Sequence, residues 1–209
     1  MTRRIVLASA NPKKVAELQA LLEGRFVVEP RPADLADTVE DGDTLEANAI
    51  KKASEVAAAT GAIALADDTG LFVEALDGAP GVRSARYAAD GGDADSHDDA
   101  ANVAKLLREL EAVGATDRDD RRAEFRTVVA VLGPDGAGIT AEGSVAGLIA
   151  AEERGDNGFG YDPVFEPDEG EGRTFAQMDA EEKASMSHRA RALASVELAL
   201  AQAADALGW

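Results

Sequence analysis

Residues 66–88, ADDTGLFVEALDGAPGVRSARYA, hold two adjacent carboxylates, an apolar run and a loop of glycine, proline, arginine and tyrosine. The short apolar run 62–66 has the length of a buried strand, and we expect Asp67 and Asp68 at the end of that strand. Carboxylates at such a place are costly unless a cation balances them, and a divalent metal is the commonest such cation. A turn cap beside a solvated acid is the simpler interpretation of the pair taken alone.

The charge of the chain narrows the class of its partners. The 209 residues include 21 basic and 40 acidic side chains, for a net charge of −19. Because polyphosphate and anionic lipid surfaces repel such a protein, we expect neither nucleic acid nor a membrane as a partner. A small anionic substrate would need a local cationic pocket. The absence of cysteine excludes disulfides, thiolate catalysis and cysteine-bound zinc.

The apolar segments are all short. The run before Asn11 is too brief for a signal peptide, and no stretch approaches the roughly 18 apolar residues of a membrane span. These features predict a cytoplasmic protein. The acidic surplus fits either a high-salt cytoplasm or ordinary solubility, and both interpretations stay open.

The first strand and helix form a candidate anion site. Residues 5–8 are typical of a strand, and Pro12 suits the first turn of a helix that ends near Gly24. Ser9, Asn11 and Lys14 then lie where a helix start favours anions. The glycine pattern of a Walker A loop is absent, so simple capping by serine and asparagine is the alternative.

A second helix is expected over residues 44–60, with Gly61 as its stop. Asn48 and Lys52 lie one turn apart beside its apolar face and are in reach of whatever sits at the helix start. Glu40, upstream, is a carboxylate that a loop could bring near the two aspartates.

The middle of the chain contains a hairpin and polar connections. Residues 125–132 and 139–145 have the pattern of two paired strands. The segment 90–99 lacks the order of an EF-hand, so we interpret it as a solvated loop with a helix cap. The mixed-charge run 117–122 is expected at the surface.

Two later segments contain candidate ligand contacts. Phe159 and Tyr161 lie in the glycine-rich loop 155–163, where a ring could cover a base or could anchor a turn. His188 and Arg189 are expected in the first turn of a helix, where cations are disfavoured unless an anion or an acceptor offsets the cost. A surface pair is the alternative.

Five motifs in order, SANPKK, TLEANAIKKA, ADDTGLFVEALDGAPGVRSARYA, GFGYDPVF and EEKASMSHRARAL, closely resemble the inosine/xanthosine triphosphate pyrophosphatases, also called HAM1-like. The resemblance runs from residue 5 to about residue 195. It implies Mg²⁺-dependent hydrolysis of ITP, dITP and XTP to the monophosphate and pyrophosphate. It also implies one α/β domain over residues 1–209, with a long mixed β-sheet, flanking helices and two lobes around a central active-site cleft, usually as a homodimer.

The resemblance assigns roles by position. Ser9, Asn11 and above all Lys14 would hold the triphosphate, and Asp68 matches the metal-linked general base. Thr69 would add a hydroxyl or backbone contact. The segment that covers the base is matched by Phe159, Gly160, Tyr161 and Asp162. The residues that read the 6-oxo side of the base are matched by Lys183, His188 and Arg189.

The implied Mg²⁺ site is acidic. We expect Glu40, Asp67 and Asp68 as ligands, with Asp37 or Asp41 as alternatives to Glu40. In the loop 81–87, Ser84 and Arg86 are the expected contributors to the cleft.

Two other functions remain as alternatives. A related Maf-type pyrophosphatase would act on pyrimidine triphosphates, but the SHR segment and the GFGYD loop argue against it. A regulator that binds a triphosphate without cleaving it would have no need for a water-activating acid such as Asp68.

Overall fold

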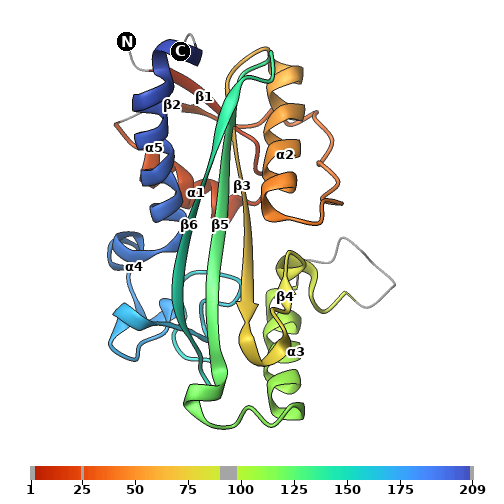
Figure 1. The fold of residues 1–209 in the computed structure, drawn as a ribbon, viewed down its shortest axis with the longest axis vertical. Helices are drawn as coiled ribbons and strands as arrows, with labels where there is room; N and C mark the ends of the chain where they lie inside the picture. Colours follow the sequence, from red (N-terminus) through yellow and green to blue (C-terminus); the bar gives the residue numbers. More distant parts are fainter. Residues whose placement is uncertain (1–2, 25, 90–97, 208–209) are drawn as a thin grey trace. The chain divides into compact units, whose positions relative to one another are not determined.

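The computed structural model describes residues 3–24, 26–89 and 98–207, with side chains for residues 4–24, 26–89 and 98–201. Strands and helices alternate from β1 to β3, three strands follow one another from β5 to β7, and short 3-10 turns join several elements (Figure 1). The strands are β1 (Arg3–Leu7), β2 (Phe26–Glu29), β3 (Ala64–Val73), β4 (Pro80–Gly81), β5 (Arg122–Leu132), β6 (Gly138–Ile149) and β7 (Phe165–Pro167). The helices are α1 (Pro12–Leu22), α2 (Leu45–Thr60), α3 (Asp99–Ala112), α4 (Ala180–Met186) and α5 (His188–Leu207).

The strands form one mixed sheet. Their order is β2-β1-β3-β5-β6-β7, and β4 pairs with β3 outside this path. β1 lies parallel to both β2 and β3, whereas the pairs β3–β4 and β6–β7 are antiparallel. The predicted mixed α/β class with flanking helices is confirmed.

The chain divides into two compact units, each built from segments that are distant in sequence. The first unit comprises Met1–Asp68, Thr127–Gly143 and Arg189–Trp209, and the second comprises Thr69–Arg126 and Ser144–His188. The chain passes between the units within β3, β5 and β6, and again at the start of α5.

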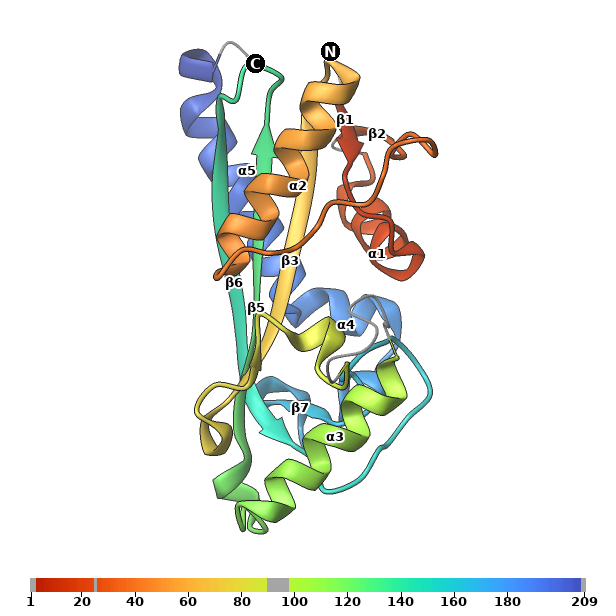
Figure 2. The ribbon, with the colours of Figure 1, turned by 90° about the vertical axis from the view of Figure 1, so that its right-hand side faces the viewer.

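The first unit has helices on both faces of its strands. One core joins α1 and α5 to the sheet through residues such as Leu18, Leu65 and Leu193. α2 buries Ala49, Ala53 and other small residues, and Figure 2 shows it on the side of the strands opposite α5. The spacing of these residues along each helix made this packing predictable.

The second unit has a more aromatic core. Phe125, Phe165 and Phe175 pack together, and the buried face of α3 adds Leu106 and Leu110. Such aromatic packing fixes the orientation of the rings that lie nearby.

The predicted helix ends are confirmed. The Asn11 side chain accepts hydrogen bonds from the backbone N–H groups of Lys13 and Lys14 at the start of α1. Thr44 caps α2, and Gly61 ends that helix with a φ of 64°, a conformation that glycine adopts without strain.

The prediction that the strand ends before Asp67 was wrong. β3 continues from Ala64 to Val73, so both aspartates lie within it. The strand continues because Leu71 and Val73, further along, enter the core of the second unit. Internal cations replace solvent as the partners of the two carboxylates, as described below.

The run 117–122 was wrongly assigned to the surface as a whole. Arg121 is buried and donates hydrogen bonds to the backbone carbonyls of Ala115, Ile149 and Ala150. It closes the connection before β5, which starts at Arg122 rather than at Phe125.

Most of the loop predicted over 90–99 lies outside the described residues. Asp98, at the end of that loop, caps α3 as expected.

Within the described part of the chain, no helix combines the length and the apolarity that crossing a membrane requires.

Candidate functional site

The aspartates of β3 point to opposite faces of the strand. Successive side chains of a strand alternate in direction, so Asp67 and Asp68 cannot share one face. Asp67 meets residues from the starts of α1 and α5, and Asp68 meets residues from α2. The site in the first unit therefore has two sides.

On the first side, Asp67 is enclosed by cations. Its Oδ2 lies 3.2 Å from Nζ of Lys14 and accepts hydrogen bonds of 3.2 Å from Nε and Nη2 of Arg189. Burial raises the pKa of Asp67, but the charges of Lys14, Arg189 and Lys52 outweigh burial and hold that pKa well below its usual value. These cations therefore favour the ionised form of Asp67.

A second acid completes this side. Glu17, one turn after Lys14 on α1, forms an ion pair with Nη1 of Arg189. Arg189 itself is only 1% exposed. Three ion pairs thus connect four charged side chains, Lys14, Asp67, Arg189 and Glu17, in a series that we call the ring because it begins and ends on α1.

On the second side, α2 holds Asp68. Lys52 donates a hydrogen bond of 2.8 Å to Oδ1, and the amide of Asn48 donates one of 3.2 Å to Oδ2. The Asn48 carbonyl accepts a hydrogen bond of 2.8 Å from the backbone N–H of Gly42. Asn48 therefore ties the loop before α2 to the carboxylate of β3.

Lys52 links two acids. Its Nζ lies 3.0 Å from Oε1 of Glu40 as well as 2.8 Å from Asp68. Burial lowers the pKa of Lys52, but Asp68, Glu40 and Asp67 outweigh burial and raise it. Burial is also the largest influence on Asp68, and it raises the pKa of this carboxyl despite the charges of Lys52 and Lys14.

The two acids considered as alternatives to Glu40 lie elsewhere. Asp41 forms an ion pair with Lys51, and Asp37 forms one with Arg31. Both carboxylates are largely exposed, at 67% and 79% of the side chain respectively. Of the three candidates, Glu40 is therefore the one that the structure brings beside Asp68.

Two of the three predicted metal ligands, rather than all three, lie where they could bind one metal ion. Among them, no three acidic or histidine side chains gather as a metal site, and Asp67 lies on the other face of β3 from Asp68. Glu40 and Asp68, however, converge on one cation, the ammonium of Lys52. Mg²⁺ in nucleotide enzymes typically takes one or two carboxylates, with phosphates and water supplying its other ligands.

The remaining residues of the first unit's predicted site lie around the start of α1. Asn11 caps the helix, and its backbone N–H donates a hydrogen bond of 3.2 Å to Oγ of Ser9. Ser9 and Asn11 therefore lie just before α1, and Lys14 lies in its first turn. Thr69, half-buried, follows Asp68 as the first residue of the second unit.

In the second unit, a separate cluster surrounds Asp162. Its Oδ2 accepts hydrogen bonds of 2.8 Å from the backbone N–H of Phe159 and 2.7 Å from Nζ of Lys183. Lys183 also lies 5.1 Å from the centre of the Phe159 ring. Phe159 itself is half-buried.

Tyr161 takes the role of a buried anchor. It is 4% exposed, and its hydroxyl donates a hydrogen bond to the backbone carbonyl of Ser84. The neighbouring N–H of Gly160 is bound to Asp99. Ser84 in turn accepts from the N–H of Leu71 and donates to Gly81, so it holds the loop after β3 rather than facing a ligand.

His188 belongs to the same unit. Its ring stacks on Phe125 at a centroid distance of 4.5 Å and is 3% exposed. It adjoins Arg189 in sequence, but the two side chains enter different units. The predicted trio therefore separates: Lys183 and His188 lie in the second unit, and Arg189 joins the ring in the first.

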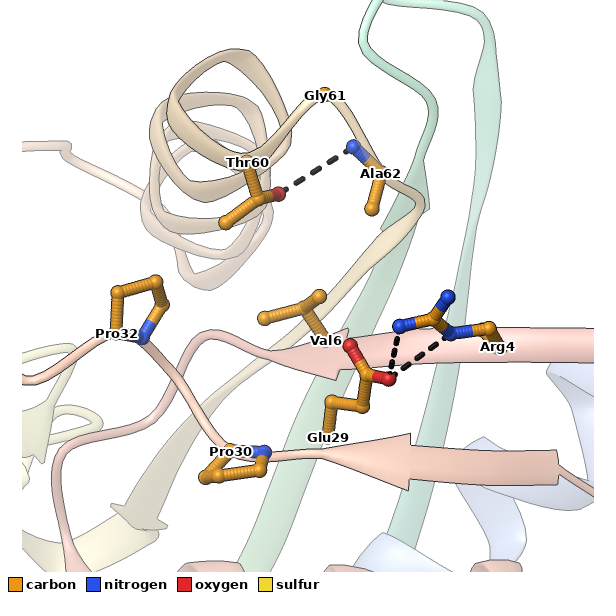
Figure 3. A pocket seen from close by; sticks show the side chains of 8 residues that line it. All are labelled: Arg4, Val6, Glu29, Pro30, Pro32, Thr60, Gly61 and Ala62. Carbon is orange, nitrogen blue, oxygen red and sulfur yellow. Dashed lines mark hydrogen bonds and ion pairs between the residues drawn. The ribbon is translucent and has the colours of Figure 1, made fainter.

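A surface pocket of about 370 Å³ lies elsewhere in the first unit (Figure 3). It is formed where β1 and β2 meet the end of α2, and Arg4 on its wall is paired with Glu29. None of the predicted site residues lines it.

The sequence did not identify every residue of the site. Asn48 and Lys52 were noted for their spacing but not assigned to the site, although that one-turn spacing was the available signal. Nothing in the sequence pointed to Glu17, because its partner Arg189 is 172 positions away.

Comparison with known proteins agrees with this architecture. The model of the Ham1 family matches residues 5–198. A dITP/XTP pyrophosphatase from Geobacter sulfurreducens is 44% identical, over 99% of this chain and 97% of its own length. One from Desulforamulus reducens is 49% identical, over 91% of this chain and 92% of its own. The structure of a HAM1 protein from Coxiella burnetii superposes with a TM-score of 0.82 at 40% identity, over 96% of this chain and all of the other. This chain belongs to the Ham1 family.

Proposed function

We propose that this protein hydrolyses non-canonical purine nucleoside triphosphates, ITP, dITP and XTP, to the monophosphate and pyrophosphate. The names of the relatives, dITP/XTP pyrophosphatase, support the substrate class. The observation that carries the proposal is the environment of Asp68, a buried carboxyl of raised pKa that meets a second acid on one cation.

Asp68 is the proposed general base. It accepts a proton from a water molecule whose oxygen attacks the α-phosphorus, and the bond from that phosphorus to the bridging oxygen breaks. Pyrophosphate leaves with the electron pair of this bond. A base of raised pKa is better matched to proton transfer near neutral pH than an ordinary aspartate.

Mg²⁺ is the proposed cofactor, and Glu40 and Asp68 would hold it. When bound, this ion neutralises charge on the phosphate oxygens during displacement. Lys14 and Lys52 add two ammonium groups in the same unit, and the start of α1 favours an anion. These groups would balance the charge of a triphosphate on a protein of net charge −19.

Recognition of the base is assigned to the second unit. Phe159 is an aromatic ring in a glycine-rich loop and is suited to stacking on a base, and Lys183 and His188 are the proposed donors toward a 6-oxo group. The 6-amino group of ATP is itself a hydrogen-bond donor, so it would face other donors and find no acceptor. Such a mismatch costs affinity because buried polar groups lose their hydrogen bonds.

A nucleotide panel tests the reaction. The purified protein is incubated with MgCl₂ and ITP, dITP, XTP, ATP, GTP or dTTP, and pyrophosphate release is followed. We expect the highest kcat/KM for ITP, dITP and XTP. Preference for dTTP would favour the Maf-type alternative, and binding without cleavage would favour the regulator.

Two further measurements address the cofactor and the assembly. Removal of divalent ions with EDTA should abolish turnover, and added MgCl₂ should restore it; full activity in EDTA would refute the cofactor. We also propose a cytoplasmic homodimer, for which sedimentation should give twice the 21.6 kDa mass of the chain.

A further inference from the structure

The backbone of Phe159 is held on both sides of its Cα atom. On the preceding side, its N–H donates a hydrogen bond of 2.8 Å to Oδ2 of Asp162. On the following side, its carbonyl accepts one of 3.2 Å from the N–H of Asp162. The N–H of Gly160, in the same peptide unit as that carbonyl, donates one of 3.0 Å to Oδ2 of Asp99. Because a peptide unit is planar, these bonds restrict both φ and ψ of Phe159.

Asp99 is the partner that comes from outside the loop 155–163. It lies 61 positions before Gly160, in the first turn of α3. The loop itself has a permissive backbone, because Gly158 and Gly160 have φ values of 77° and 61°. A bond to a regular helix therefore fixes the loop relative to the rest of the second unit, which the bonds within the loop cannot do.

The same helix supports the next attachment of the loop. The hydroxyl of Tyr161 donates a hydrogen bond of 2.9 Å to the carbonyl of Ser84. Asn102, buried one turn into α3, donates one of 3.1 Å to the carbonyl of Ala85 and accepts one of 2.7 Å from the N–H of Ala88. The segment that receives Tyr161 is thus itself bound to α3, and all of these residues belong to the second unit.

We infer, on the basis that Phe159 contacts the base as proposed above, that Asp99 is a positioning residue for Phe159. Its hydrogen bond to the N–H of Gly160 holds the aromatic side chain where it meets the base. The acceptor oxygen of Asp99 matters here rather than its charge, because its partner is a neutral backbone group. The simpler role for an acid in the first turn of a helix is to stabilise the helix start, and the test has to separate the two.

Inosine monophosphate and inorganic tripolyphosphate distinguish contacts to the base from contacts to the phosphates. The Kd of each is measured by isothermal titration calorimetry with MgCl₂ and the full chain, and kcat/KM is measured for ITP. For Asp99→Ala we expect a Kd for inosine monophosphate about five-fold higher and a similar fall in kcat/KM, because the ring is less well placed. The Kd for tripolyphosphate should change less than two-fold.

Three matched variants sharpen the test. Asp99→Asn keeps an acceptor oxygen without the charge and should bind inosine monophosphate within two-fold of the wild type. Asp98→Ala removes the cap of α3, which accepts from the N–H of Ala101, and should lower the melting temperature without changing that Kd. In a Phe159→Ala background, Asp99→Ala should add less than a two-fold effect, because the side chain that it positions is gone.

Other outcomes would overturn the inference. Equal losses in Asp99→Ala and Asp99→Asn would mean that the charge of Asp99 acts, and a loss of the same size in Asp98→Ala would mean that only the helix start matters. An effect that persists in full without the Phe159 ring would exclude positioning of that ring. Failure of the wild type to cleave ITP would refute the proposed function instead, since both Kd values are measured without turnover.

Discussion

The two faces of β3 carry adjacent aspartates in opposite electrostatic settings. Asp67 contacts Lys14 and Arg189, and these cations hold its pKa below the usual value. Asp68 shares the single ammonium of Lys52 with Glu40, and burial raises its pKa. Burial is nearly the same for both side chains, at 2% and 4% exposure, so the supply of cations makes the difference.

This difference assigns distinct tasks to two identical residues. A carboxylate with two cationic partners is stable in its charged form and serves to organise its neighbours. A carboxylate that shares one cation with a second acid is incompletely neutralised. It can therefore bind a further cation or accept a proton. The first description fits Asp67, and the second fits Asp68.

The largest expected effect concerns Asp68. Asp68→Asn should lower kcat for ITP by about 10³-fold, because it removes the general base and one of the two proposed metal ligands. Pyrophosphate release measures the rate, and circular dichroism checks that the fold persists. Turnover within ten-fold of the wild type would place the base elsewhere.

The matched change on the other face should act on stability. Asp67→Asn leaves Lys14 and Arg189 without the carboxylate that both contact, and breaking a buried ion pair in this way costs about 3 kcal/mol or more. Urea unfolding in EDTA measures the free energy of unfolding. A cost for Asp67→Asn no larger than that for Asp68→Asn would remove the contrast between the faces.

The pH dependence of stability follows from the same contrast. The folded pKa of Asp67 lies below the unfolded value of 3.8, so its contribution to the free energy of unfolding is complete above that pH. The contribution is lost as the pH falls below that value toward the lowered folded pKa. Urea midpoints between pH 3 and 7 should therefore fall more steeply on the acid side in the wild type than in Asp67→Asn. Parallel curves would contradict the lowered pKa.

The sequence predicted much of the local structure, because its signals are local. Asn11, Thr44 and Gly61 lie at the helix ends where their types predict them, and the small apolar residues of α2 mark its buried face. The continuation of β3 beyond Asp68 could not be read in this way. Two consecutive aspartates are typical of a strand end unless cations distant in the sequence lie beside them.

The sequence predicted which residues belong to the candidate site better than it predicted which of them form ion pairs and hydrogen bonds with one another. Glu40, Asp68 and Lys14 could be named from their motifs, but the partner of each was not evident. Arg189 reaches Asp67 over 122 positions, a distance that only the folded chain closes. Arg121 shows the same limit, because a buried arginine that binds three carbonyls looks like a surface residue in the sequence.

An effect of intermediate size is expected for the acids of the loop before α2. Glu40 binds the buried Lys52, whereas Asp41 binds the more exposed Lys51. Glu40→Gln should raise the Mg²⁺ concentration for half-maximal turnover about ten-fold, because one of two metal carboxylates is lost. Asp41→Asn should change it less than two-fold. Equal effects of the two variants would mean that the loop acts through its overall charge.

The smallest expected effect concerns the contact that steadies Asp68. Asn48 donates to Asp68 and accepts from the N–H of Gly42, so Asn48→Ala should lower kcat by about five-fold through a less well-oriented carboxylate. Gly42→Ala tests the same contact from the loop, because an added Cβ would lie 2.7 Å from Oδ1 of Asn48. If the contact orients Asp68, both variants reduce kcat to a similar extent, and combining them adds little. Fully multiplicative losses in the double variant would show that Gly42 and Asn48 act separately, and the ordering of Asp68 would then depend on Lys52 alone.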